Sequence, residues 1–120
     1  MHKEENSYTY MLRCTDGSIY TGITKDVGRR MKEHKEQGKE CAKYTRTHQF
    51  LRLEAVFSSS TWSEAAKLEY AIKRLPKEKK EQLIARPELV TAMFGDRLSG
   101  CSFTPVVVEY KEENVSISKG

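Results

Sequence analysis

The first part of the chain has the β-rich pattern of a hairpin. Tyr8–Cys14 (YTYMLRC) and Ile19–Ile23 (IYTGI) are rich in aromatic and β-branched side chains, which favour strands. Between them, Thr15–Ser18 (TDGS) contains an Asp-Gly pair, which is a strong turn signal. Further along, Phe50–Phe57 (FLRLEAVF) alternates in part and predicts a third strand.

A helical stripe follows the hairpin. Val27, Met31 and His34 recur at helical spacing, which predicts a helix from about Asp26 to Gln37. The next segment, Lys39–Gln49, is basic and polar and predicts a loop before the third strand.

Two more helices are predicted after the third strand. Thr61 and Glu64 match a capping box, in which the hydroxyl and the carboxylate bind free amides of the first turn. The apolar stripe of this helix consists of Ala65, Leu68, Ile72 and Leu75. Pro76 suits the first turn of a shorter helix over about Lys77–Ala85.

The last part of the chain predicts an extension. Its segments are a helix over Pro87–Phe94, a loop over Gly95–Pro105, a strand over Val106–Tyr110 and a frayed tail from Lys111. The order is therefore β-β-α-β-α-α plus this extension, which is an α+β fold. We expect a flexible N-terminus at 1–6, one domain at 7–85 and a C-terminal extension at 86–120.

The composition fits a single domain. The chain has 120 residues, of which 38% are hydrophobic and 32% charged, enough for one modest core. No stretch approaches the roughly 20 apolar residues of a membrane span, and residues 1–7 lack the apolar core of a secretory signal. We therefore expect a cytoplasmic protein. Cys14, Cys41 and Cys101 form no CxxC pair and the histidines complete no zinc spacing, so we expect reduced thiols.

Positive charge is concentrated in the first half of the chain. Lys25–Arg52 has nine Lys and Arg against four Asp and Glu, whereas Arg86–Gly120 has four against five. Such a basic stretch attracts polyanions, chiefly through their phosphates, and indicates nucleic acid as the partner class. On charge alone, an ordinary solvated surface is the simpler interpretation.

Three motifs occur in a fixed order along the chain. They are YMLRCTDGSIYTGITKDVGRRMKEH at 10–34, CAKYT at 41–45 and SEAAKLEY at 63–70. Together they resemble the GIY-YIG nuclease superfamily, and within it a small, stand-alone bacterial branch. The resemblance covers about residues 7–85. It implies a three-stranded, mainly antiparallel sheet flanked by helices, and hydrolysis of nucleic-acid phosphodiesters in processes such as DNA repair and recombination.

The resemblance also implies roles for the matching residues. The candidate catalytic residues are Tyr10, Tyr20, Arg30, His34 and Glu69, with Glu69 also the ligand of Mg²⁺ or Mn²⁺. Gly22 is a structural glycine that permits close backbone approach. The candidate nucleic-acid contacts are Arg29, Lys43, Tyr44 and Arg46. The late asparagine of many members has no counterpart here.

Phosphodiester hydrolysis explains why these residue types are needed. The site must orient a water molecule, remove its proton and place positive charge on the phosphoryl oxygens. Tyr20 is the candidate general base or proton relay, helped by nearby positive charge, because a phenol of pKa about 10 is a poor base at neutral pH. Arg30 suits the scissile phosphate, since its guanidinium group can donate two parallel hydrogen bonds to two phosphate oxygens. Tyr10 orients Tyr20 or the phosphate, and His34 donates to phosphate or holds a tyrosine hydroxyl.

Each candidate also has an ordinary structural interpretation. Glu69 could pair with Lys73 at i, i+4 spacing, and Arg30 could be a surface charge. The tyrosines could simply pack in the sheet, and His34 could be a buried histidine with satisfied hydrogen bonds.

The hairpin turn decides whether the two tyrosines can cooperate. A two-residue turn at Asp16-Gly17 would put Tyr10 and Tyr20 on opposite faces of the sheet. We therefore predict a three-residue loop or a bulge, which places Tyr20 opposite Leu12 and diagonal to Tyr10.

Three functions fit the sequence. The favoured hypothesis is a metal-dependent endonuclease acting on DNA, with RNA left open as a substrate. The second is a catalytically weak nucleic-acid-binding module on the same scaffold. The third is an interaction protein whose partner pairs with a strand at Val106–Tyr110. We expect no membrane partner and no small-molecule cofactor.

Overall fold

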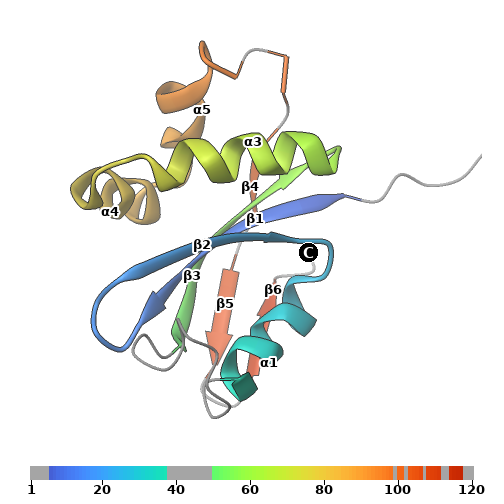
Figure 1. Ribbon diagram of the computed structural model, residues 1–120, viewed down its shortest axis with the longest axis vertical. Coiled ribbons are helices and arrows are strands. Elements are labelled where there is room, and N and C mark those ends of the chain that lie inside the picture. The colour runs from blue at the N-terminus through green and yellow to red at the C-terminus, as the bar shows by residue number, and fades with distance from the viewer. Residues whose placement is uncertain are drawn as a thin grey trace, which may run out of the picture.

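A four-stranded antiparallel sheet forms the centre of the protein (Figure 1). The computed structural model describes residues 6–37, 50–98, 100–101, 103–106, 108–111 and 114–117. The strands lie in the order β2-β1-β3-β4, and their bounds are β1 Ser7–Cys14, β2 Ile19–Thr24, β3 Phe50–Ser59 and β4 Thr104–Val106. The three expected strands are confirmed. The fourth comes from the C-terminal extension and pairs with β3.

The hairpin between β1 and β2 has the predicted three-residue loop. Leu12 is opposite Tyr20 and Tyr10 is opposite Gly22, so the two tyrosines share one face of the sheet. The Cys14 amide donates to the Ser18 carbonyl at 2.9 Å and closes the loop. Gly17 has a φ of 89°, which glycine adopts without the steric cost that a Cβ would bring.

Four helices flank the sheet: α1 Val27–Gln37, α3 Trp62–Lys73, α4 Lys77–Ala85 and α5 Leu89–Phe94. The Asp26 carboxylate caps α1 by accepting from the Arg29 amide at 3.1 Å. The capping box of α3 is confirmed in that the Thr61 hydroxyl accepts from the Glu64 amide. The Glu64 carboxylate accepts from the Ser60 amide, one residue earlier than expected. None of the helices in the described ranges is long and apolar enough to cross a membrane.

Alternation along β1 divides the core into two clusters, one on each face of the sheet. Tyr10, Leu12 and Cys14 face α1 and pack with Val27 and Met31. The intervening side chains face the other way, where the buried core is made of Met11, Ala55, Phe57, Leu68, Ala71, Ile72, Leu83, Val90 and Phe94. The sheet is therefore covered by α1 on one face and by α3, α4 and α5 on the other (Figure 1).

The C-terminal extension contributes to the fold more than its sequence indicated. Its helix α5 buries Val90 and Phe94 in the core. The strand expected at Val106–Tyr110 is confirmed in part: its described residues belong to two strands, β4 and β5 (Val108–Lys111), which pair with different strands. The expected frayed tail is wrong in part: β6 (Asn114–Ile117) pairs with β5 in a second, two-stranded sheet beside α1.

Candidate active site

The hydroxyl of Tyr10 is the centre of a polar cluster between β1 and α1. It lies 2.9 Å from His34 Nε2 and accepts a hydrogen bond from Arg30 Nε at 3.3 Å. The phenol ring itself is buried, with 1% of its surface exposed. Burial is the main cause that raises the pKa of Tyr10 to about 12. Tyr10 therefore keeps its proton at neutral pH and acts as a hydrogen-bonding group.

His34 is a neutral imidazole in this cluster. Burial, helped by the positive charge of Arg30, lowers its pKa to about 4. The Tyr10 hydroxyl accepts from Arg30 and can donate its own proton to His34 Nε2 in the tautomer that carries the imidazole proton on Nδ1. Of the two roles considered for His34, the contact at 2.9 Å corresponds to holding a tyrosine hydroxyl. It is also a buried histidine with a hydrogen-bond partner, so the ordinary interpretation and the positioning role coincide.

The guanidinium of Arg30 is held by two neighbours. Its Nε donates to Tyr10, and its Nη1 donates to Glu33 Oε1 at 2.9 Å. Within the described residues no acceptor bonds to Nη2, and about a third of the side chain (32%) remains exposed. Arg30 therefore presents an oriented N–H edge to solvent beside the tyrosines.

Tyr20 and Gly22 complete the tyrosine side of the cluster. The Tyr20 ring lies 6.2 Å from the Tyr10 ring and 5.3 Å from the His34 ring, centroid to centroid. A Cβ on Gly22 would lie 2.5 Å from the Tyr10 hydroxyl oxygen and 3.1 Å from the Tyr20 ring. The register of β1 and β2 continues without a shift through Gly22, so no bulge explains this glycine. Only glycine leaves room for Tyr10 to lie across β2.

Glu69 reaches the cluster by its charge and not by a hydrogen bond. It lies on α3, and its negative charge contributes to the raised pKa of Tyr10, although less than burial does. Its carboxylate, 22% exposed, also pairs with Lys73 Nζ at 3.2 Å. The surface ion pair that was the ordinary interpretation is therefore present, and Glu69 is at the same time within electrostatic range of Tyr10.

The remaining candidates are not part of this cluster. Arg29 is 65% exposed and pairs at 3.4 Å with Glu33, the carboxylate that also binds Arg30, but it has no hydrogen bond to the tyrosines or His34 among the described residues. The candidate contacts Lys43, Tyr44 and Arg46 lie outside the described residues. Among the described cysteines, Cys101 is a free thiol, and Cys14 packs in the core cluster that contains Tyr10 but forms no hydrogen bond to its hydroxyl.

Sequence reasoning missed Glu33, which binds the same arginine that was assigned to phosphate. The Arg30 guanidinium holds the pKa of Glu33 below its ordinary value, so Glu33 is a carboxylate at neutral pH. The signal was the i, i+3 spacing of the two residues on α1, which favours an ion pair on a helix surface.

The donor set permits a magnesium-type site and does not resemble a zinc site. Within the described residues, no three His, Cys, Asp or Glu side chains are close enough to hold a metal together. Glu33 is taken up by Arg30, which leaves Glu69 as the carboxylate whose charge acts on Tyr10 without being bonded to the cluster, and Mg²⁺ commonly keeps several waters and takes one or two protein carboxylates. The residues therefore fit a hydrated Mg²⁺ or Mn²⁺ ion held by Glu69.

This fold and this cluster agree with the result of comparing the chain with known families. The model of the GIY-YIG catalytic domain matches residues 6–82, and the chain belongs to the GIY-YIG family. The match contains all five candidate catalytic positions and associates the chain with nuclease-type function.

Within that family, the similar curated relatives are UPF0213 proteins. One from Fusobacterium nucleatum is 47% identical over 81 residues, which cover 68% of this chain and 79% of the relative. Another, from Halalkalibacterium halodurans, is 49% identical over 80 residues, or 67% of this chain and 83% of the relative. A solution NMR structure of a UPF0213 protein from Bacillus halodurans has a TM-score of 0.44 and 44% identity, and covers 72% of this chain and 93% of that chain. The names of these relatives state no activity.

Proposed function

We propose that the protein is a metal-dependent endonuclease that hydrolyses phosphodiester bonds in DNA, in DNA repair or recombination. The observation that carries the proposal is the position of Arg30, whose guanidinium is fixed on a buried, neutral phenol beside a second tyrosine. A cation held in this way can bind a phosphate with little further loss of side-chain freedom. Family membership supplies the reaction class.

Each residue of the cluster has one task in this proposal. Arg30 binds the scissile phosphate through the N–H edge that faces solvent. Tyr10 orients Arg30, and His34 is a positioning residue because it holds the hydroxyl of Tyr10. Tyr20 is the proposed general base or relay for the attacking water, since Tyr10 retains its own proton.

Glu69 is the proposed metal ligand. Mg²⁺ or Mn²⁺ bound there supplies positive charge that offsets the charge of the phosphoryl oxygens. Lys73 is 52% exposed and makes one contact with Glu69 at 3.2 Å, and such pairs contribute little, so Lys73 can release the carboxylate to a divalent ion.

The Glu69→Gln variant tests the proposal. Wild-type protein should cleave labelled DNA with Mg²⁺ or Mn²⁺ and stop when a chelator is added, while Glu69→Gln should lose at least about a hundredfold in rate. Binding of the same DNA, measured by fluorescence anisotropy, should survive. The matched control is Glu78→Gln on α4, an exposed acid with the same charge change. Undiminished cleavage by Glu69→Gln refutes the proposal. If the wild type binds DNA but does not cleave it, the alternative function, a catalytically weak nucleic-acid-binding module, is favoured.

A further inference from the structure

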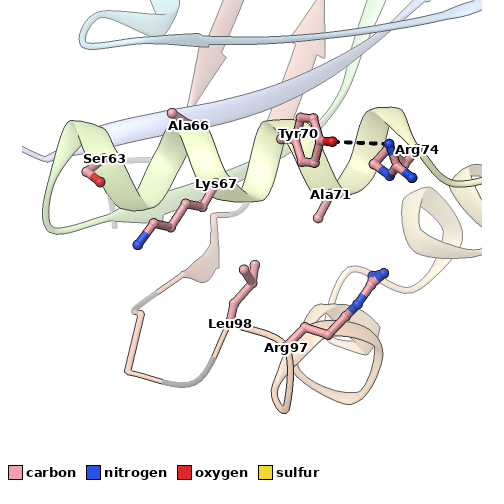
Figure 2. Close-up of a pocket in the computed structure, with 8 residues that line it drawn as sticks. All are labelled: Ser63, Ala66, Lys67, Tyr70, Ala71, Arg74, Arg97 and Leu98. Atoms are coloured by element: carbon pink, nitrogen blue, oxygen red, sulfur yellow. Dashed lines mark hydrogen bonds between the residues drawn. The ribbon is translucent and has the colours of Figure 1, made fainter.

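A cavity lies on the side of α3 that faces the turn after α5. Its volume is about 580 Å³, within the range typical of small-molecule sites. Figure 2 shows Arg97 and Leu98 facing α3 across this space. The lining residues are Ser63, Ala66, Lys67, Tyr70, Ala71, Arg74, Arg97 and Leu98. Tyr70 follows Glu69 directly on α3, and consecutive helical side chains point about 100° apart, so this cavity is separate from the tyrosine cluster.

The charged groups that line the cavity are all cations. Lys67, Arg74 and Arg97 line it, and no carboxylate does. Throughout the described part of the chain, none of these three has an acidic partner within ion-pair distance. Elsewhere the ion-paired cations are Arg13, Arg29, Arg30, Arg52, Lys73, Lys77 and Arg86. Uncompensated positive charge around a concave surface indicates an anionic ligand.

An exposed aromatic ring, that of Tyr70, lines the same cavity as these cations. Tyr70 is 64% exposed, more than any other large hydrophobic side chain in the described part of the chain. Arg74 Nη1 donates to the Tyr70 hydroxyl at 3.1 Å, and the Arg74 guanidinium lies 5.3 Å from the ring centroid (Figure 2). This contact holds the guanidinium beside the ring, so that a cation and an aromatic surface are available together to a ligand.

The remaining lining is small and apolar. Ala66, Ala71 and Leu98 provide a surface without charge beside the cations. A ligand that matches the whole cavity must therefore combine a flat or apolar part with a negative group. A bare phosphate satisfies only the cations, and an acidic peptide leaves the aromatic ring without a planar partner.

We infer that the cavity between α3 and Arg97–Leu98 is a binding site for a nucleoside phosphate. The base stacks on Tyr70, and the phosphate is bound by Lys67, Arg74 and Arg97. The ligand is either a free nucleotide or one nucleotide of a longer strand, since both present the same chemistry. The site is independent of the metal-dependent reaction proposed above.

Isothermal titration calorimetry with adenosine monophosphate tests the inference. Binding should be saturable, and both adenosine and inorganic phosphate should bind at least about tenfold more weakly, because each lacks one of the two groups. Tyr70→Ala and Arg74→Gln should each weaken binding by roughly fivefold or more. Lys79→Gln, which removes one exposed lysine of α4, is the control with unchanged affinity. Glu69→Gln should also bind normally, so this inference and the proposed nuclease can fail separately.

A 5′-phosphorylated oligonucleotide distinguishes the two sources of the ligand. If adenosine monophosphate binds and depends on Tyr70 and Arg74, the ligand is a free nucleotide. If only the oligonucleotide shows that dependence, the ligand is one nucleotide of a strand. The inference is overturned if neither binding depends on these residues, or if a glutamate-rich peptide binds as tightly through Arg74 while Tyr70→Ala has no effect.

Discussion

Arg30 is shared between Tyr10 and Glu33, and this sharing has a cost for phosphate binding. Nε and Nη1 are already engaged, so a phosphate bound at the open Nη2 can take Nη1 as well only in competition with the Glu33 carboxylate. Glu33 is on the surface of α1 and its carboxylate is solvated, so displacement is possible. The affinity of the proposed site is therefore set by a competition between one carboxylate and the phosphate.

Glu33→Gln should strengthen DNA binding. The variant removes the competing charge and leaves the hydrogen bond between Tyr10 and Arg30 in place. We expect roughly two- to fivefold tighter binding at low salt, measured by fluorescence anisotropy. Glu36→Gln makes the same charge change on an exposed position of α1 and serves as the control. Equal effects of the two variants would show that net charge, and not the pairing with Arg30, controls affinity.

His34 should make the protein sensitive to mild acid. Its pKa of about 4 in the folded state is below the ordinary 6.5, so between these values the unfolded chain binds a proton that the native state does not. The contribution of His34 to the free energy of unfolding is therefore fully present above pH 6.5. It decreases by on the order of 3 kcal/mol as the pH falls toward 4. Denaturant unfolding at pH 7 and pH 5 measures this loss.

His34→Gln isolates the contribution of the imidazole to that loss. Glutamine cannot take up the proton, and its amide can still bond to Tyr10. The stability difference between pH 7 and pH 5 should shrink to a small remainder in this variant. A difference as large as that of the wild type would assign the acid sensitivity to other groups.

At the scale of elements, an arginine on β1 joins the sheet to α4. Arg13 donates to both carboxylate oxygens of Glu81 at 2.6 Å, and its Nε donates to Glu54 on β3 at 2.9 Å. The hydrogen bonds to Glu81 are the main cause that raises the pKa of Arg13 above its ordinary value. Leu83 is the one buried residue of α4, so the ion pair between Arg13 and Glu81 is a substantial part of what holds α4 against the sheet.

Glu81→Gln should loosen α4. The variant loses the charge of a bidentate pair while Arg13 stays mostly buried, and we expect a loss of about 1 kcal/mol because Glu81 is partly exposed. Thermal unfolding measures the loss, with Glu78→Gln as the control on the same helix. Arg13 also lowers the pKa of Glu81 to about 2, so the stabilisation is present above the ordinary 4.5 and disappears as the pH falls toward 2. An unchanged melting temperature in Glu81→Gln would contradict this account.

At the scale of the whole molecule, the core continues past the segment that matches the family. The family model ends at residue 82, whereas Val90 and Phe94 are buried against the same cluster as Leu83. The strand β4 also pairs with β3, and its Val106 side chain packs against the core cluster that contains Tyr10. The predicted boundary between the domain at 7–85 and the extension at 86–120 stays a prediction, while the buried core contains residues from both sides of it.

Phe94→Ala should show how much the extension stabilises the domain. Removing a fully buried phenylalanine is expected to lower the free energy of unfolding by roughly 3 kcal/mol. The control is Thr91→Ala, an exposed position one turn earlier on α5. A chain truncated after Ala85 should lack a cooperative unfolding transition. If the truncated chain is as stable as the full chain, the extension packs against the domain without stabilising it.

Local signals in the sequence were sufficient for most elements and for the composition of the site. The capping box at Thr61, the proline before α4 and the turn at Asp16-Gly17 act within a few residues, so sequence alone places them. The need for Tyr10 and Tyr20 on one face even predicted the loop length. The extension was harder to predict, because β4 is held by pairing with β3, which is distant in the chain.

The sequence by itself determined the family, the order of the core elements and which side chains are available for chemistry. Only the tertiary structure decided how those side chains are used. Burial against α1 makes Tyr10 a firmly protonated phenol and His34 a neutral partner, and Gly22 is required by the ring that crosses it. These properties arise from desolvation and from contacts between residues that are far apart in the chain, neither of which a local pattern contains.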